Sequence, residues 1–173
     1  LLGRLGVGLI LVLEAQHLLA VRKLPAAVLS TPAQRRNQFF RLVIVGDGPD
    51  RELLKIMVRN LGLDRKVYLV GAKSQKELAT YLAAADMFVL NSGYEGFSHQ
   101  ILEAMAAGVP VVVSAISGNK EVIEQGENGF LVEPKNSHLL AEKISQLLAN
   151  EELRKKFGEN SKRIISPYTI ESY

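Results

Sequence analysis

Runs of consecutive apolar residues alternate with segments of helical periodicity from residue 41 onward. The apolar runs are short and are bounded by turn-forming or charged residues, as is typical of β-strands. Between them, apolar residues recur at intervals of three and four, which predicts amphipathic helices. We expect strands at residues 41–46, 66–71, 86–91, 110–114 and 129–133. We expect helices at residues 49–63, 74–85, 99–107, 119–126, 137–150 and 151–165.

The strands carry apolar residues at successive positions, which indicates a sheet that is covered on both faces. Strand and helix succeed each other regularly, and this order predicts right-handed crossovers and parallel strands. A chain of 173 residues fits one domain. The predicted fold class is therefore α/β, with a doubly wound parallel sheet.

The two ends of the chain are less regular. Residues 1–20 are apolar enough to raise the question of a signal peptide, but Arg4 and Glu14 interrupt them. Their apolar run is also too short to span a bilayer, so we favour a buried strand that leads into a helix. Residues 22–41 contain two prolines and a basic cluster, which indicate a loop, and residues 166–173 form a tail.

Composition narrows the functional classes. Apolar residues make up 47% and charged residues 23% of the chain, as in an ordinary globular protein. The net charge of +3 comes from scattered side chains rather than a basic block, which argues against nucleic acid as a partner and leaves anionic ligands or lipid head groups open. The chain contains no cysteine, which excludes disulfides and thiolate metal ligands and fits a reducing cytoplasm.

The loop after the strand at 41–46 contains Gly46 and Gly48, which allow a tight turn and close approach of a ligand to the backbone. A dinucleotide-binding fingerprint needs a third glycine where Arg51 stands, and the Walker pattern is also missing. A purely structural turn, with Asp50 as the cap of the next helix, explains this loop equally well.

The segment NSGYEGFSHQILEAMAAGVPVVVS, residues 91–114, is more informative. Ser98 is the expected helix N-cap, and Gly108 followed by Pro110 ends the helix. The apolar positions expected to face the sheet are Ile101, Leu102, Met105 and Ala106.

Two carboxylates, Glu95 and Glu103, bracket the start of this helix. Free N–H groups at a helix N-terminus attract anions or sugar oxygens, and a carboxylate deeper in the helix can accept hydrogen bonds from a diol. This arrangement indicates a nucleotide joined to a polar group. Spacing alone leaves an alternative open, in which Glu95 stabilises the helix dipole and Glu103 forms a surface salt bridge.

Two other kinds of site are disfavoured. His99 and Glu103 are four residues apart, but the other histidines are distant in sequence and there is no HExxH pattern, so we expect no metal site. Ser92 and Ser98 lack the Gly-x-Ser-x-Gly elbow of a hydrolytic triad.

YEGFSHQILEAMAAGVPVVVS, followed by SGNKEVIEQGENGFLVE, resembles the C-terminal domain of retaining glycosyltransferases of family 4, also called glycosyl transferases group 1. RLVIVGDGPDRELL and VYLVGAKSQKELATYLAAADMFVLNS match in order and spacing, so that the resemblance covers about residues 41–165. Glu95 and Glu103 fit the Glu-x7-Glu pattern of the family. The resemblance implies the Rossmann-like C-terminal half of a GT-B fold.

The resemblance further implies a nucleotide-sugar donor. By position, Glu103 would hold the ribose hydroxyls, and Glu95 would be the catalytic residue that positions the sugar. The backbone of Gly96, Phe97 and Ser98 would join Glu95 in holding the sugar and the diphosphate.

Four further residues are assigned by the same resemblance. Gly71 and Ala72 would lie beside the base, and Gly46 would line the cleft. Arg4 is the cation expected on the diphosphate, while the lysine that the family places a few residues later is missing. We expect no metal or other cofactor, because the helix N-terminus and basic side chains neutralise the leaving diphosphate.

The resemblance also implies partners and domain organisation. Residues 1–165 would form the donor-binding domain, and residues 166–173 resemble the start of a segment that crosses back to an N-terminal acceptor domain absent from this chain. The acceptor would be lipid-linked or a polysaccharide, and the enzyme cytoplasmic, with any membrane contact made by the acceptor domain. The first hypothesis is therefore one half of a retaining hexosyltransferase, inactive alone. The alternative is a degenerate, non-catalytic module that binds a nucleotide or a partner.

Overall fold

The computed structural model describes residues 8–13, 40–91 and 99–166, and the side chains of residues 40–91 and 99–166. The strands are β1 (Gly8–Leu13), β2 (Phe40–Val45), β3 (Val67–Gly71), β4 (Met87–Leu90), β5 (Val111–Ser114) and β6 (Gly129–Val132). The helices are α2 (Arg51–Asn60), α3 (Gln75–Ala84), α4 (His99–Ala107), α5 (Ser117–Lys120), α6 (Ser137–Ala149) and α7 (Glu151–Ile165).

The six strands form one sheet in the order β3-β2-β1-β4-β5-β6, and every neighbouring pair is parallel. Strands β2 and β3 lie on one side of β1, and strands β4, β5 and β6 follow in order on its other side. The doubly wound parallel sheet predicted from the sequence is therefore confirmed. In such sheets ligands bind beyond the carboxyl ends of the strands, where the order reverses, which here is between β1 and β4.

Two hydrophobic clusters cover the two faces of the sheet. In β4, Met87 and Val89 belong to one cluster while Phe88 and Leu90 belong to the other, and none of the four is exposed to solvent. Burial on both faces explains why the strands read as continuous apolar runs.

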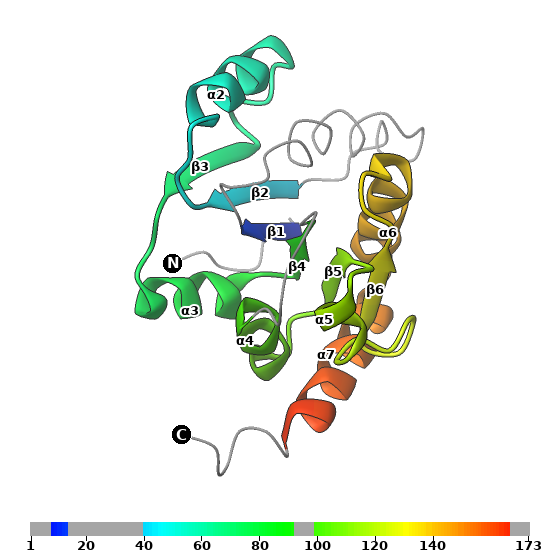
Figure 1. Ribbon diagram of the computed structural model, residues 1–173. Helices are drawn as coiled ribbons and strands as arrows, with labels where there is room; N and C mark the ends of the chain where they lie inside the picture. Colours follow the sequence, from blue (N-terminus) through cyan, green and yellow to red (C-terminus); the bar gives the residue numbers. More distant parts are fainter. Residues whose placement is uncertain (1–7, 14–39, 92–98, 167–173) are drawn as a thin grey trace.

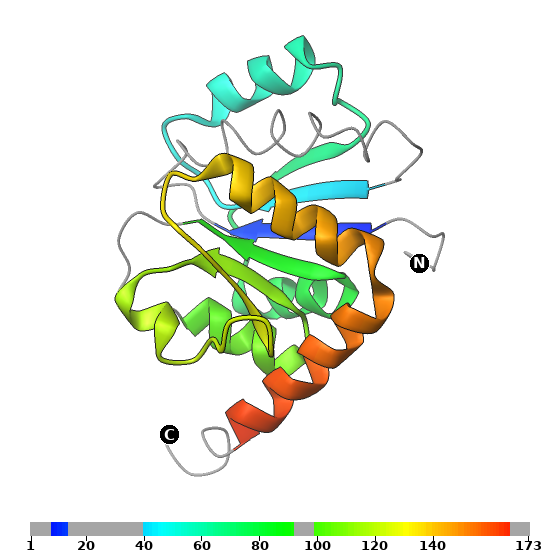
Figure 2. The same cartoon turned by 90° about the vertical axis from the view of Figure 1, so that its right-hand side faces the viewer.

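The helices divide between these faces. Apolar side chains of α2 and α6 belong to the first cluster, and those of α3 and α4 belong to the second. Figure 1 and Figure 2 show α6 across the sheet from α3 and α4. Helix α7 joins the two layers, because Phe157 packs in the first cluster and Ile165 in the second.

One predicted helix is wrong. The sequence pattern favours a helix at residues 119–126, but α5 covers only Ser117–Lys120 and turns follow it. Asn128 explains the difference, because its side chain accepts a hydrogen bond from Glu124 N (2.8 Å) and donates one to Val122 O (2.9 Å). An asparagine that binds nearby backbone groups offers them an alternative to helical hydrogen bonds.

The buried face of α4 also differs from the prediction by one position. Ile101, Ala104 and Met105 are buried, whereas Ala106 is exposed and Leu102 is only half-buried. The spacing of three and four residues from Ile101 reaches Ala104 and Met105, so Ala106 lies beyond the stripe that contacts the sheet.

Ser74 caps α3 as predicted. Its side chain accepts a hydrogen bond from Glu77 N, and the Glu77 carboxylate accepts one from Ser74 N at 3.0 Å, which completes a capping box. Asp50 occupies the N-cap position of α2, but its side chain makes no capping hydrogen bond to a described residue.

Candidate functional site

Four of the residues assigned from the sequence lie within the described structure: Gly46, Gly71, Ala72 and Glu103. Gly46 follows β2, Gly71 ends β3 and Ala72 follows it, so all three lie at the carboxyl ends of parallel strands. Five assigned residues lie outside the described parts of the chain, and their roles stay predictions: Arg4, Glu95, Gly96, Phe97 and Ser98.

Gly46 and Gly71 are in direct contact. Gly46 N donates a hydrogen bond to Gly71 O at 2.9 Å, and φ is positive at both residues, 125° and 73°. Glycine adopts such angles without steric cost. Gly46, which the resemblance places in the cleft, is thus hydrogen-bonded to Gly71, which the resemblance places beside the base.

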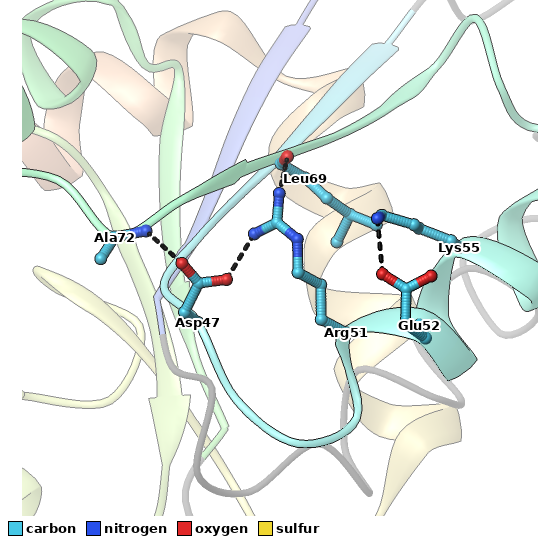
Figure 3. Close-up of polar contacts among 6 residues, drawn as sticks. All are labelled: Asp47, Arg51, Glu52, Lys55, Leu69 and Ala72. Atoms are coloured by element: carbon cyan, nitrogen blue, oxygen red, sulfur yellow. Dashed lines mark hydrogen bonds and ion pairs between the residues drawn. The ribbon is translucent and has the colours of Figure 1, made fainter.

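Asp47, the residue after Gly46, binds two partners (Figure 3). Its Oδ1 accepts a hydrogen bond from Arg51 Nη1 at 2.6 Å, and its Oδ2 accepts one from Ala72 N at 3.3 Å. Arg51 Nη2 donates to Leu69 O at 3.1 Å. We call this set of contacts the Asp47–Arg51 clasp. It joins the loop after β2 to the end of β3.

The clasp keeps Asp47 ionised. The Ala72 N–H and then the Arg51 guanidinium hold the pKa of the Asp47 carboxyl below its ordinary value of 3.8. A carboxylate that accepts hydrogen bonds in its charged form is stabilised in that form. Asp47 therefore stays ionised to a lower pH than an aspartate without these contacts.

Glu103 is half-buried in the second turn of α4. Gln75 Nε2, at the first residue of α3, donates a hydrogen bond to Glu103 Oε1 at 3.1 Å. This bond joins the Glu103 carboxylate to the first residue of α3. Glu103 takes part in no ion pair with another described residue, in contrast to the surface salt bridge left open by its spacing.

A second polar group lies at the ends of β4 and β5. Ser114 Oγ donates a hydrogen bond to Asn91 Oδ1 at 3.0 Å, and Asn119 Nδ2 donates one to Ser114 O at 2.8 Å. Ser114 and Asn119 are each 1% exposed. This network fixes Asn91, the last described residue before residues 92–98.

Sequence reasoning missed Asp47, Arg51 and Gln75. The sequence pattern singles out Arg51 only as the residue that stands in place of a third glycine, and it does not single out Asp47. The spacing of Asp47 and Arg51, four residues apart at a helix start, is the signal that was available. Their further partners are 18 and 25 residues away along the chain and become visible only in the structure.

Within the described parts of the chain, no group of three or more histidine, aspartate or glutamate side chains is placed to hold a metal ion. The described helices also include none that is long and apolar enough to cross a membrane.

Residues 12–164 match the family described as glycosyl transferases group 1. N-acetyl-alpha-D-glucosaminyl L-malate synthase of Bacillus anthracis is 36% identical over 125 residues, which cover 72% of this chain and 32% of that protein. The matching region covers about a third of the length of this synthase and of two further curated glycosyltransferases, from Methanocaldococcus jannaschii.

Two solved structures resemble the fold closely. A mutant of S. aureus TarM in complex with fondaparinux, alpha-GlcNAc-glycerol and UDP has a TM-score of 0.82 and 25% identity, over 94% of this chain and 32% of that one. The C-terminal domain of LpcC, a group 1 family glycosyl transferase from Francisella tularensis, has a TM-score of 0.80 and 26% identity. That match covers 95% of this chain and 87% of the solved domain.

Proposed function

This chain belongs to the glycosyl transferases group 1, and we propose that it is the part of such an enzyme that binds a nucleotide-sugar donor. The similarity over 87% of a solved C-terminal domain supports this assignment. The likeness to a TarM structure that contains UDP supports a nucleoside diphosphate as part of the ligand.

The hydrogen bond from Gln75 to Glu103 carries this proposal. It directs one oxygen of the Glu103 carboxylate before any ligand arrives. A carboxylate has about four lone-pair sites, so one bond to Gln75 leaves capacity for the two hydroxyls of a ribose. The base then lies beside Gly71 and Ala72, at the carboxyl end of β3.

The reaction we propose is the retaining transfer of a hexose. The acceptor oxygen attacks the anomeric carbon on the face from which the diphosphate leaves. Glu95 positions the sugar, and the N–H groups of Gly96, Phe97 and Ser98 together with Arg4 stabilise the leaving diphosphate. In this proposal no metal is required, since those groups supply the neutralising charge.

Transfer needs an acceptor-binding domain beyond these 173 residues. We propose that the chain binds its donor weakly and does not transfer sugar alone, and that the acceptor of the whole enzyme is lipid-linked or a polysaccharide. One observation favours a second candidate, a non-catalytic nucleotide-binding module: no lysine stands before Gly6 or Gly8, a few residues after Arg4, where the resemblance to the family leads us to expect a second cation.

Calorimetric titration with UDP, GDP and ADP, each alone and as its glucose conjugate, tests donor binding. We expect one base to bind and its sugar conjugate to bind more tightly. A longer form of the chain that includes the proposed acceptor-binding domain should, when given an acceptor, transfer the sugar with retention of anomeric configuration. Binding without transfer in that longer chain would favour the non-catalytic module. If none of the six ligands gives a heat of binding at millimolar concentration, donor binding is refuted.

A further inference from the structure

The Asp47–Arg51 clasp spans an irregularity in the sheet. Between β2 and β3, Ile44 pairs with Leu69 but Val45 pairs with Gly71, so that Val70 is an extra residue in β3. Such a bulge bends its strand and changes the direction of the chain that follows. Arg51 binds the carbonyl on one side of this bulge, and Asp47 binds the N–H on the other.

The bulge sets the direction of Gly71 and Ala72. Gly71 has a φ of 73°, and a β-carbon there would lie 3.2 Å from Arg51 Nη1 and 3.3 Å from Asp47 Oδ2. The clasp therefore packs tightly against the backbone of Gly71 as well as binding its neighbours. Figure 3 shows Asp47 and Arg51 between Leu69 and Ala72.

The clasp differs from the other ion pairs at this end of α2. Lys55 and Glu52 form a pair at 2.6 Å, but both belong to α2 and their side chains are 43% and 76% exposed. Exposed pairs of this kind contribute little to stability. The Asp47–Arg51 pair is also partly exposed, 57% at Asp47 and 31% at Arg51, so it differs in geometry rather than in burial. Arg51 uses both ends of its planar fork, one on a carboxylate and one on a backbone carbonyl, and this geometry fixes orientation.

We infer that Asp47 and Arg51 are positioning residues for the nucleotide, which hold Gly71 and Ala72 in the direction that receives the base. This inference rests on the proposed function. In this inference the two side chains act through the loop, by way of their bonds to Ala72 N, to Leu69 O and to each other. Loss of the clasp frees the loop, and binding then requires that the loop be ordered again.

The inference is tested with the full 173-residue chain and its Asp47→Asn, Asp47→Ala, Arg51→Lys and Arg51→Ala variants. Lys55→Ala is the matched control, because it removes an ion pair of the same helix that does not reach β3. Three quantities are measured: the exchange rate of the Ala72 amide proton without ligand, the Kd for UDP, GDP and ADP, and the midpoint of thermal unfolding.

We expect faster exchange at Ala72 and a Kd about tenfold higher in Asp47→Ala and Arg51→Ala, with an unfolding midpoint close to that of the parent. Arg51→Lys should behave like Arg51→Ala, since an ammonium cannot span Asp47 and Leu69 as the fork does. The Asp47→Ala and Arg51→Ala changes should be non-additive in the double variant, because each breaks the same set of contacts.

Two results overturn the inference while leaving donor binding intact: an unchanged Kd in all four variants, or a changed Kd that Lys55→Ala reproduces. Variants that lose affinity only in proportion to a lowered unfolding midpoint also overturn it, since that is the behaviour of a merely structural pair. If the parent chain binds none of the three nucleotides, the proposed function fails and the inference fails with it.

Discussion

Gln75 and Asp47 hold groups that we place around the nucleotide. Gln75 binds the Glu103 carboxylate, and Asp47 binds the Ala72 N–H, so both groups are oriented by protein contacts. Groups that are oriented before a ligand arrives lower the entropy cost of binding it. At the scale of single residues, Glu103 and Ala72 are thus each held by a side chain from another part of the chain.

Substitution of the two carboxylates separates their proposed roles. Glu103→Ala should weaken the binding of the plain nucleoside diphosphate by about ten- to a hundredfold, because hydrogen bonds to a charged group contribute about 1.5–3 kcal/mol. Glu95→Ala should leave that affinity nearly unchanged and remove the preference for the sugar conjugate. Calorimetry with both ligands measures this, with Glu142→Ala on α6 as the control. Equal effects of both changes on the plain nucleotide would contradict the division of roles.

The clasp has a defined pH dependence. Because the pKa of Asp47 is lowered in the folded chain, its contribution to stability is complete above the ordinary value of 3.8 and is lost as the pH falls through the lower folded value. Carbon NMR titration of the Asp47 carboxyl should therefore show a midpoint below 3.8. In Arg51→Ala the midpoint should rise toward the ordinary value. A midpoint in the parent at or above 3.8 would show that the clasp is not formed in solution.

The residues of the site differ in how far sequence could predict them. Gly46, Gly71, Ala72 and Glu103 were assigned by family resemblance, and the structure brings Gly46, Gly71 and Ala72 to one edge of the sheet. Asp47 was not assigned from the sequence. Its contact with Ala72 depends on a register shift between β2 and β3, and no local sequence pattern reveals that shift.

At the scale of elements, local signals predicted most boundaries. Helices α4 and α7 begin and end at the predicted residues, because Gly108 and Pro110 end the first and Asn150 caps the second by accepting a hydrogen bond from Leu153 N at 2.9 Å. Helix α5 is shorter than predicted, because the side chain of Asn128 satisfies backbone groups that a longer helix would use.

Close packing between α4 and α7 is another feature that periodicity does not reveal. Gly158, in the middle of α7, is buried against the backbone carbonyl of Gly108, and a β-carbon at Gly158 would collide with that oxygen. Because α4 carries Glu103, this contact fixes the helix that presents the carboxylate.

Gly158→Ala should accordingly destabilise the fold, although alanine is the better helix former by about 1 kcal/mol. Overpacking of a buried contact costs about 1–3 kcal/mol, so we expect a lower free energy of unfolding in urea. Glu159→Ala, at the next and exposed position of α7, is the control and should change little. A gain in stability from Gly158→Ala would mean that helix propensity outweighs the contact with Gly108.

At the scale of the whole molecule, the reversal of strand order between β1 and β4 defines where a ligand should bind. The loops that follow β2 and β3 lie on one side of that point and α4 lies on the other, joined through the Gln75–Glu103 contact. The alternation of strands and helices predicts a doubly wound sheet but not its strand order, since several doubly wound orders satisfy the same pattern. The structure settles that choice.

Nuclear magnetic resonance of the isotopically labelled chain, titrated with UDP, GDP and ADP, tests the central claim most directly. We predict that one of these nucleotides changes the chemical shifts of four backbone amides, those of Gly46, Gly71, Ala72 and Glu103, and that the changes saturate. The chemical shifts of amides on the exposed face of α6 should not change. Saturable shifts that avoid all four residues, or no shifts with any of the three nucleotides at millimolar concentration, would contradict the account.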